Sequence, residues 1–162
     1  MKVVFAPRGI LQITDARIIF RNFKGEGSKF NREGDRNFAL IIPDEEIAEA
    51  LKNAGWNVKI KAPRDPDDTP FMYLGVKVKF NDRGPDVYLE SGKKVNMLSE
   101  EDVDVLDDID ILSVDMHIRP YDYEVNGSTG RAAYLQKIWV TQQIDSFAQR
   151  YADYAPDDEV QY

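Results

Sequence analysis

The chain has 162 residues, of which 43% are hydrophobic and 31% are charged, and its formal net charge is −8 at pH 7. A chain of this length predicts one globular domain with a tail. The absence of cysteine excludes disulfides and thiolate metal sites, and because no apolar run suits a signal peptide or a membrane helix, we expect a soluble intracellular protein.

Two strands joined by a polar connection are predicted first. Within residues 11–23 the alternation places Phe20 on the core face and the arginines beside it on the opposite face. Residues 36–42 form the second strand, in which Phe38 is a second expected core residue. Because residues 24–35 between them are polar and rich in glycine, we expect a long hairpin with a flexible tip.

A helix is predicted over residues 43–55. Pro43 and Asp44 suit its start, two glutamates suit its first turn, and a glycine ends it. The next two segments, 56–62 and 71–80, alternate apolar residues with lysine and tyrosine, which is the pattern of half-buried strands.

The second half of the chain is also dominated by strands. Two short strands are predicted at 86–90 and 94–98, and a short acidic helix follows at 99–110. A long hairpin with an Asn-Gly turn joins strands at 110–125 and 131–144. Because strand follows strand, we expect a mainly β, mostly antiparallel small barrel with one or two inserted short helices.

The acidic residues are concentrated in two segments. Residues 99–110 hold seven acids and no base, and residues 151–162 hold four acids and no base. Without these eleven acids the net charge of −8 becomes +3. The rest of the chain can therefore present a basic face in spite of the acidic total.

No pattern in the sequence predicts catalysis. His117, the one histidine, lies on a predicted strand without an acid–base motif beside it, and no phosphate-binding glycine loop occurs. The acids of residues 99–110 could indicate a metal-dependent nuclease, but their spacing fits a solvated helix face better than a calcium loop. We therefore expect no enzyme, no cofactor and no metal site.

Basic and aromatic side chains recur together on the outward faces of several predicted strands. Single-stranded nucleic acid is bound by these two types, because cations follow the phosphates and bases stack on rings, with roughly 1–3 kcal/mol per base. On any one strand an ordinary solvated face explains them better, but their repetition over four or five strands favours binding. The candidates are Arg17, Arg21, Phe23, Lys24, Lys29, Phe30, Arg32, Lys59, Lys61, Tyr73, Lys77, Lys79, Arg119, Tyr121, Tyr123 and Arg131.

The acidic C-terminus has two interpretations, and charge alone leaves both open. Many chains end in a charged tail without a specific role. Alternatively, an anionic tail can imitate nucleic acid, and then it occupies the basic groove of its own protein or docks on a basic partner. The residues for such a role are Asp157, Asp158, Glu159 and Tyr162.

Four segments resemble a group of bacteriophage single-stranded-DNA-binding proteins, and the resemblance covers about residues 11–143. The segments are "RIIFRNFKGEG…FNREGDRNFALII", "GWNVKIKAPRD", "YLGVKVKF" and "IRPYDYEVNGSTGRAAYLQKIWVT". The resemblance implies an OB-fold-like antiparallel Greek-key barrel with extended hairpins over residues 1–145. It also implies that this domain coats single-stranded DNA in phage replication, recombination or repair, in the cytoplasm of the infected bacterial host.

The same resemblance gives residues 146–162 a role as a flexible acidic tail that recruits a polymerase, helicase or primase. "APDDEVQY" is similar to the pattern of such tails, but it ends in Tyr rather than Phe and has few acids. We expect the 17–38 and 119–131 hairpins to flank the DNA groove.

Two other functions stay open at this point. A β-barrel interaction module, such as a phage structural or adaptor protein, would use the basic and aromatic hairpin against an acidic protein surface. A metal nuclease would use the acids of residues 99–110. Exposed barrel edges also allow a homodimer, although no particular residue indicates one.

Overall fold

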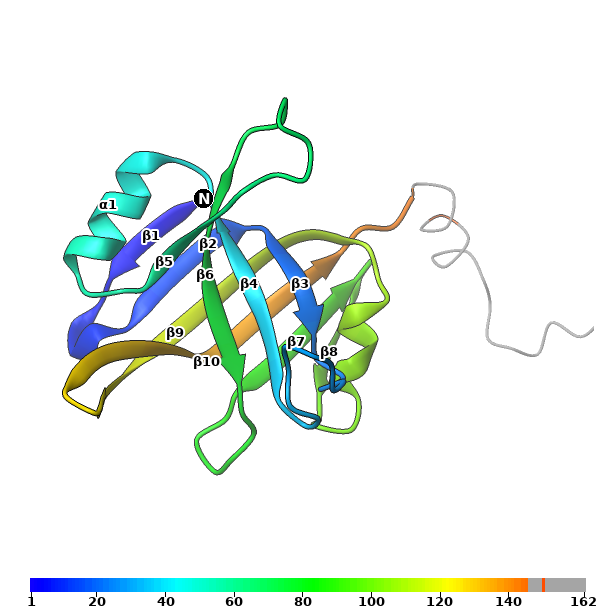
Figure 1. Ribbon diagram of the computed structural model, residues 1–162. Helices are drawn as coiled ribbons and strands as arrows, with labels where there is room; N and C mark the ends of the chain where they lie inside the picture. The colour runs from blue at the N-terminus through cyan, green and yellow to red at the C-terminus, as the bar shows by residue number, and fades with distance from the viewer. Residues whose placement is uncertain (146–149, 151–162) are drawn as a thin grey trace, which may run out of the picture.

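The computed structural model describes residues 1–145 and residue 150, and strands make up most of it (Figure 1). The strands are β1 (Lys2–Phe5), β2 (Leu11–Ala16), β3 (Ile18–Asn22), β4 (Arg36–Ile42), β5 (Val58–Lys61), β6 (Phe71–Val78), β7 (Asp86–Ser91), β8 (Lys94–Leu98), β9 (Ile111–Val125) and β10 (Ser128–Gln142). The helical elements are α1 (Glu45–Asn53) and the 3-10 helices η1 (Pro7–Gly9) and η2 (Val103–Asp107).

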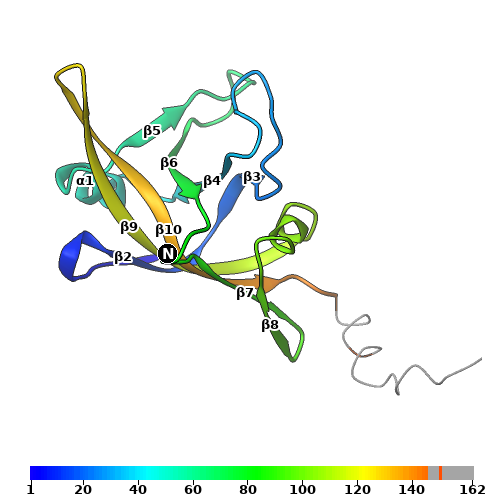
Figure 2. The same ribbon diagram turned by 90° about the horizontal axis from the view of Figure 1, so that it is seen from below.

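The described strands form one curled, mixed sheet built on the β9–β10 hairpin. The strand order is β1-β2-β9-β10-β6-β4-β3, with β5 paired to β6, and with β7 and β8 attached to β10 as a side branch. Strand β10 pairs in parallel with β6 through Ala133 and Tyr134, and then with β7 from Lys137 onward. The register shift between Leu135 and Lys137 marks this change of partner, so one long strand serves two parts of the sheet (Figure 2).

The core lies between the two parts of the curled sheet. All described buried side chains are hydrophobic, and each large one contributes about 1.5–3 kcal/mol to folding. At one end, α1 buries Ala48 and Leu51. At the other end, η2 buries Val103 and Leu106 beside β3. The two helical elements thus close the ends of a core whose sides are strands.

The predicted helix is confirmed as α1, which starts two residues later and ends two residues earlier than the predicted range 43–55. The Asp44 carboxylate accepts a hydrogen bond of 2.8 Å from the backbone N–H of Ile47, which is the arrangement of an N-cap. The glutamates at positions 45 and 46 occupy the first turn, where negative charge complements the helix dipole. No described helix is long and apolar enough to cross a membrane.

One face assignment in the first hairpin is wrong. Phe23, expected on the outer face, is 0% exposed, whereas Phe20, expected in the core, is 50% exposed. Between Ile19 and Asn22 the register of β3 against β4 shifts by one residue, and Phe20 has a φ of 54°. An extra residue in a strand reverses the faces of everything that follows it, so strict alternation misassigns both rings.

Phe23 is therefore a core residue and not a DNA contact. Its ring stacks on that of Phe38 with the centroids 5.5 Å apart and the planes at 19°. Phe38, the other expected core residue, is 2% exposed, so that prediction is confirmed.

Candidate nucleic-acid interface

A groove of about 730 Å³ crosses the outer face of β4 and β6 and continues along the projecting end of the β9–β10 hairpin. Its middle is lined by small residues, including Ala39, its cross-strand neighbour Gly75, and Ala132. A Cβ atom at Gly75 would meet nothing within 4 Å, so the space above this strand is open. The groove is therefore deep enough in its middle for a planar group to approach the backbone.

Aromatic rings stand at both ends of this groove. At one end, the centroid of Phe20 lies 6.1 Å from that of Phe71 and 6.5 Å from that of Tyr73. At the other end, Tyr121 and Tyr134 meet edge to face at 6.0 Å. Four different strands supply these rings, and each ring offers a face or edge on which a base can stack.

Basic side chains lie among the rings. Lys61 Nζ lies 4.9 Å from the centroid of Phe20, and the guanidinium carbon of Arg119 lies 4.9 Å from the centroid of Tyr134. Lys77 Nζ lies 5.9 Å from the same Tyr134 ring, and Lys59 lines the groove. Cations at these distances are attracted by the ring faces, which holds positive charge beside the stacking surfaces.

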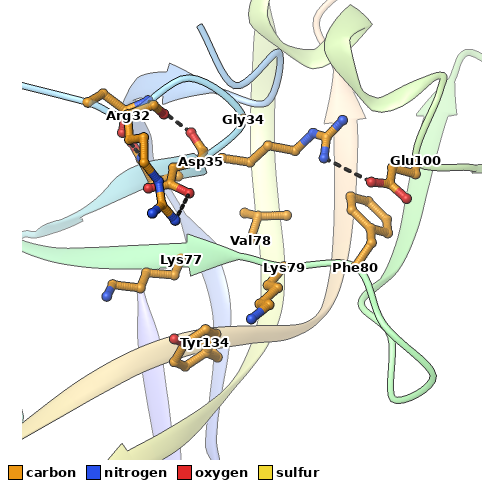
Figure 3. Close-up of a pocket in the computed structure, with 12 residues that line it drawn as sticks. Arg32, Gly34, Asp35, Lys77, Val78, Lys79, Phe80, Glu100 and Tyr134 are labelled. Atoms are coloured by element: carbon orange, nitrogen blue, oxygen red, sulfur yellow. Dashed lines mark hydrogen bonds and ion pairs between the residues drawn. The ribbon is translucent and has the colours of Figure 1, made fainter. Parts of the chain in front are cut away.

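A second hollow of about 440 Å³ continues the groove toward β3 and η2 (Figure 3). The two share Asn37, Lys77 and Tyr134. Figure 3 shows Lys77 on β6 and Lys79 just after it near Tyr134, with Arg32 at the opposite side. The basic surface is thus continuous from the tyrosine end of the groove to the loop after β3.

Several cations of this surface have no anionic partner in the protein. Within residues 1–145, no carboxylate lies within ion-pair distance of Lys29, Lys59, Lys61, Lys77, Lys79 or Arg119. By contrast, Arg36 lies 3.1 Å from Glu100, and Arg32 lies 3.4 Å from Asp35. The unpaired lysines are the cations most available to an anionic ligand.

The loop between β3 and β4 is organised by the side chain of Asn31. Its amide nitrogen donates to the carbonyl oxygens of Glu26 and Asp35, both at 2.9 Å, and its amide oxygen accepts from Asn37 at 2.9 Å. The loop expected as a flexible tip is thus tied to β4. Exposed Phe30 projects from it into the groove lining, with Lys29 Nζ 5.8 Å from its ring centroid.

Arg131 holds the β9–β10 hairpin against the turn after α1. Its guanidinium donates to the Asp122 carboxylate at 2.7 and 3.2 Å and to the carbonyl oxygen of Ala54 at 2.7 Å, and it lies 5.2 Å from the centroid of the Trp56 ring. The hydrogen bond with Arg131 lowers the pKa of the Asp122 carboxyl, and the same bond raises the pKa of Arg131. This cation of the groove lining is therefore already engaged by three hydrogen bonds to protein partners.

The same hairpin orients Tyr123. The Tyr123 ring lies so close over Gly130, its cross-strand partner, that a Cβ at Gly130 would overlap it. A larger residue at position 130 would therefore displace this ring, which lines the groove together with Tyr121.

The structure brings together most of the predicted site residues. Nine line the groove or the second hollow, namely Phe30, Arg32, Lys59, Tyr73, Lys77, Lys79, Tyr121, Tyr123 and Arg131. Three more, Lys29, Lys61 and Arg119, lie over rings that line them.

The remaining predicted residues lie elsewhere. Besides buried Phe23, Arg21 donates to the carbonyl oxygens of Leu106 and Ile109, at 2.6 and 2.7 Å, and so it fastens η2. Lys24 Nζ lies 2.9 Å from Asp108 Oδ1, a hydrogen bond that raises the lysine pKa. Arg17 lines a separate hollow between β3 and β9. The predicted tail residues, Asp157, Asp158, Glu159 and Tyr162, lie outside the described residues.

Sequence reasoning missed several residues of the surface. Tyr134 stands between buried Ala133 and Leu135, so alternation alone would have placed it outward. Phe20 reaches the groove only through its positive φ, which no simple pattern indicates.

The acids of residues 99–110 have a structural role in part, because both carboxylate oxygens of Asp107 accept backbone N–H groups at the end of β3. Within the described residues, no cluster of acidic or histidine side chains suits a metal ion.

Comparison with known proteins yields a family and a fold. Residues 1–161 match the family model of a phage ssDNA-binding domain. Among curated proteins, none matches the chain. The chain is similar in structure to the single-stranded DNA-binding protein of bacteriophage Enc34 in complex with ssDNA, with a TM-score of 0.59 at 15% identity over 90% of this chain and 93% of that one.

Two further structures of the Enc34 protein are similar as well. The C-terminally truncated form has a TM-score of 0.56 at 13% identity, over 88% of this chain and 91% of that one. Another has a TM-score of 0.55 at 14% identity, over 91% and 93%. These likenesses concern the fold, and they confirm the expected mainly β, OB-fold-like class, although the sheet is mixed and the described strands do not close it into a barrel.

Proposed function

The chain belongs to the phage ssDNA-binding domain family, and we propose that it binds single-stranded DNA without sequence preference along the groove between β4–β6 and the β9–β10 hairpin. One observation carries the proposal: stacking rings and unpaired lysines from five strands and a loop line one continuous surface. Bases stack on the rings, and the lysines neutralise the phosphates that follow them. The Enc34 protein, which shares the fold, has been solved with ssDNA.

The chemistry of the lining favours single strands over duplex. A ring can stack on a base only when the base face is exposed, and in a duplex those faces are covered by neighbouring pairs. Every base has such a face, so stacking discriminates weakly among sequences. The ring clusters around Phe20 and Tyr134 stand on opposite sides of the open middle, which suits a strand that runs from one to the other.

The protein acts by binding and without catalysis or a cofactor, in phage DNA replication, recombination or repair. Residues 1–145 form the DNA-binding domain. Residues 146–162 act as an acidic tail that recruits a polymerase, helicase or primase, with Asp157, Asp158, Glu159 and Tyr162 as the contacts. This activity belongs to the cytoplasm of an infected bacterial cell. The charge of the segment and the family membership support these roles.

Fluorescence anisotropy with labelled oligonucleotides tests the central proposal. We expect tight binding to oligo-dT, weaker binding to duplex of equal length, and a logarithmic affinity that falls with the logarithm of salt by about 0.7 per phosphate contact. RNA of matched sequence shows whether the sugar is discriminated.

Two results of the same titration would overturn the proposal. Equal micromolar or weaker binding to single and double strands would favour a protein-interaction module. Loss of full-length oligonucleotide on addition of magnesium would favour a nuclease.

A further inference from the structure

Strand β8 is an edge strand with exposed apolar side chains. Among the strands that the structure describes, β8 pairs with β7 alone. Val95 is 45% exposed and Met97 is 60% exposed, and no charge stands between them. Proteins usually protect an open edge with charged residues or proline, and the centre of β8 has neither. Figure 2 shows the β7–β8 hairpin on the side of the molecule away from β4, β5 and β6.

The apolar surface continues inward from this edge. Met97 pairs with Tyr88, and Tyr88 pairs with Trp139 on β10. The Tyr88 and Trp139 rings stack with centroids 5.4 Å apart and planes at 28°. Cross-strand partners lie on the same face of a sheet, so these three side chains form one row that ends at the open edge.

The backbone of β8 has its open hydrogen-bonding groups at the two apolar residues. A two-residue turn, Gly92 and Lys93, joins β7 to β8, which makes Ser91 and Lys94 a hydrogen-bonded pair. Because such pairs alternate along an antiparallel ladder, the N–H and C=O groups of Val95 and Met97 point away from β7. These groups are therefore directed at whatever lies beside the edge.

We infer that a second copy of this chain pairs antiparallel with β8 across a two-fold axis at Asn96. In this register Val95 of each copy faces Met97 of the other, so the outward backbone groups meet and the apolar side chains cover each other. Lys94 of each copy then faces Leu98 of the other. The strand is thus complementary to itself in backbone pattern and in apolar side chains.

The dimer leaves both DNA grooves open and does not depend on DNA binding. It would place two binding surfaces in one particle, which raises the effective concentration of the second groove for a long strand. Edge strand β1 also exposes apolar side chains, with Val4 41% exposed. The experiment must therefore distinguish a dimer that pairs through β8 from one that pairs through β1.

Sedimentation velocity of the full chain without DNA tests the dimer. We expect a dimer that forms between about 1 and about 100 µM protein, as for edge interfaces of modest affinity. Val95→Lys and Met97→Lys should each weaken it by about tenfold or more, whereas Val4→Lys, a similarly exposed valine on edge strand β1, should leave it unchanged. A monomer at every concentration, or a dimer lost only in Val4→Lys, would overturn the inference.

Cysteine crosslinking tests the register, because the chain has no cysteine of its own. The axis places position 96 of both copies in a non-hydrogen-bonded pair, with Cα atoms about 4.5 Å apart, within the range of a disulfide. Asn96→Cys should therefore form a dimer under mild oxidation. The control Lys94→Cys should not, because its two copies lie about 13 Å apart along the strand.

Equal crosslinking of both variants would reject the register. The oligo-dT affinity of each variant, measured separately, keeps this result distinct from failure of the DNA-binding proposal.

Discussion

Replacing Arg131 with alanine should weaken DNA binding without removing a phosphate contact. In the structure the guanidinium is held by Asp122, by the Ala54 carbonyl and by the Trp56 ring. These contacts fasten the β9–β10 hairpin, which supplies Tyr121 and Tyr123 to the groove. Arg131 is thus expected to position the tyrosines rather than to touch the DNA.

The size of the effect follows from the contacts that are lost. A hydrogen bond from a charged donor to a carbonyl contributes about 1.5–3 kcal/mol, and a cation over a ring adds about 0.5–2 kcal/mol. Because the hairpin end is exposed and the contacts are not additive, we expect a net loss of about 2 kcal/mol in holding the hairpin. If only the fastened hairpin binds, the DNA affinity scales with the fastened fraction, so that loss sets an upper limit of about 30-fold on the decrease in affinity.

The salt dependence of oligo-dT binding distinguishes positioning from contact. Arg131→Ala should lower the affinity at every salt concentration and leave the slope unchanged. Lys77→Ala, the matched control for a phosphate contact, should reduce the slope by about 0.7.

Asp122→Asn adds a test, because the two roles of Arg131 predict opposite changes in DNA affinity for this variant. If Arg131 positions the hairpin, this variant weakens binding, because the guanidinium loses its ionic partner. If Arg131 contacts phosphate, removing the competing carboxylate strengthens binding. A reduced slope in Arg131→Ala together with tighter binding by Asp122→Asn would refute the positioning role.

Three further predictions concern Phe20, Phe23 and the pair of Asp122 with Arg131. Phe20→Gly should weaken oligo-dT binding by about tenfold, because a stacking ring is lost. The same variant should keep or raise the melting temperature, because a bulky residue at positive φ is strained by about 1–3 kcal/mol. A lower melting temperature would contradict this explanation. Phe23→Ala should cost about 3–5 kcal/mol in urea unfolding, since it empties the stack on Phe38, and a cost below 1 kcal/mol would place the ring outside the core. The hydrogen bond with Arg131 lowers the pKa of Asp122, so this pair contributes to stability above the ordinary carboxyl pKa, and the contribution is lost as the pH falls through the lowered value. In an NMR titration, Arg131→Ala should therefore raise the pKa of Asp122. An unchanged pKa would show that the pair does not form in solution.

The parts of the site that alternation could predict are those on regular strands. On β6 the outward residues Tyr73, Gly75 and Lys77 follow one another with period two, and the structure places all three in the groove. On β9 the same rule places Tyr121 and Tyr123 correctly. Where a strand keeps its period, the pattern of side chains is enough to assign a face.

The failures have local and tertiary causes. At Phe20 the positive φ and the extra residue reverse the faces of β3, and neither follows from residue type, because a bulky side chain at positive φ is rare. At Arg131 the deciding partner, Ala54, lies 77 residues away and offers only a backbone carbonyl. A contact to a distant backbone atom has no signature in sequence, so the role of this arginine emerges only from the fold.

Which cations can bind phosphate likewise depends on their ion pairs within the protein, and the net charge of the chain does not show it. Lys24, Arg36 and Arg131 each meet a carboxylate of the protein itself, and Arg21 is engaged by two carbonyls at η2. A cation that already has an anionic partner gains little from a phosphate, because it must first give that partner up. The cations without a carboxylate partner remain for the phosphates, and among them Lys59 lies on β5, Lys77 on β6 and Lys79 just after β6. The acidic segment 99–110 therefore confines the unpaired positive charge to the groove, because its carboxylates neutralise the cations beside η2.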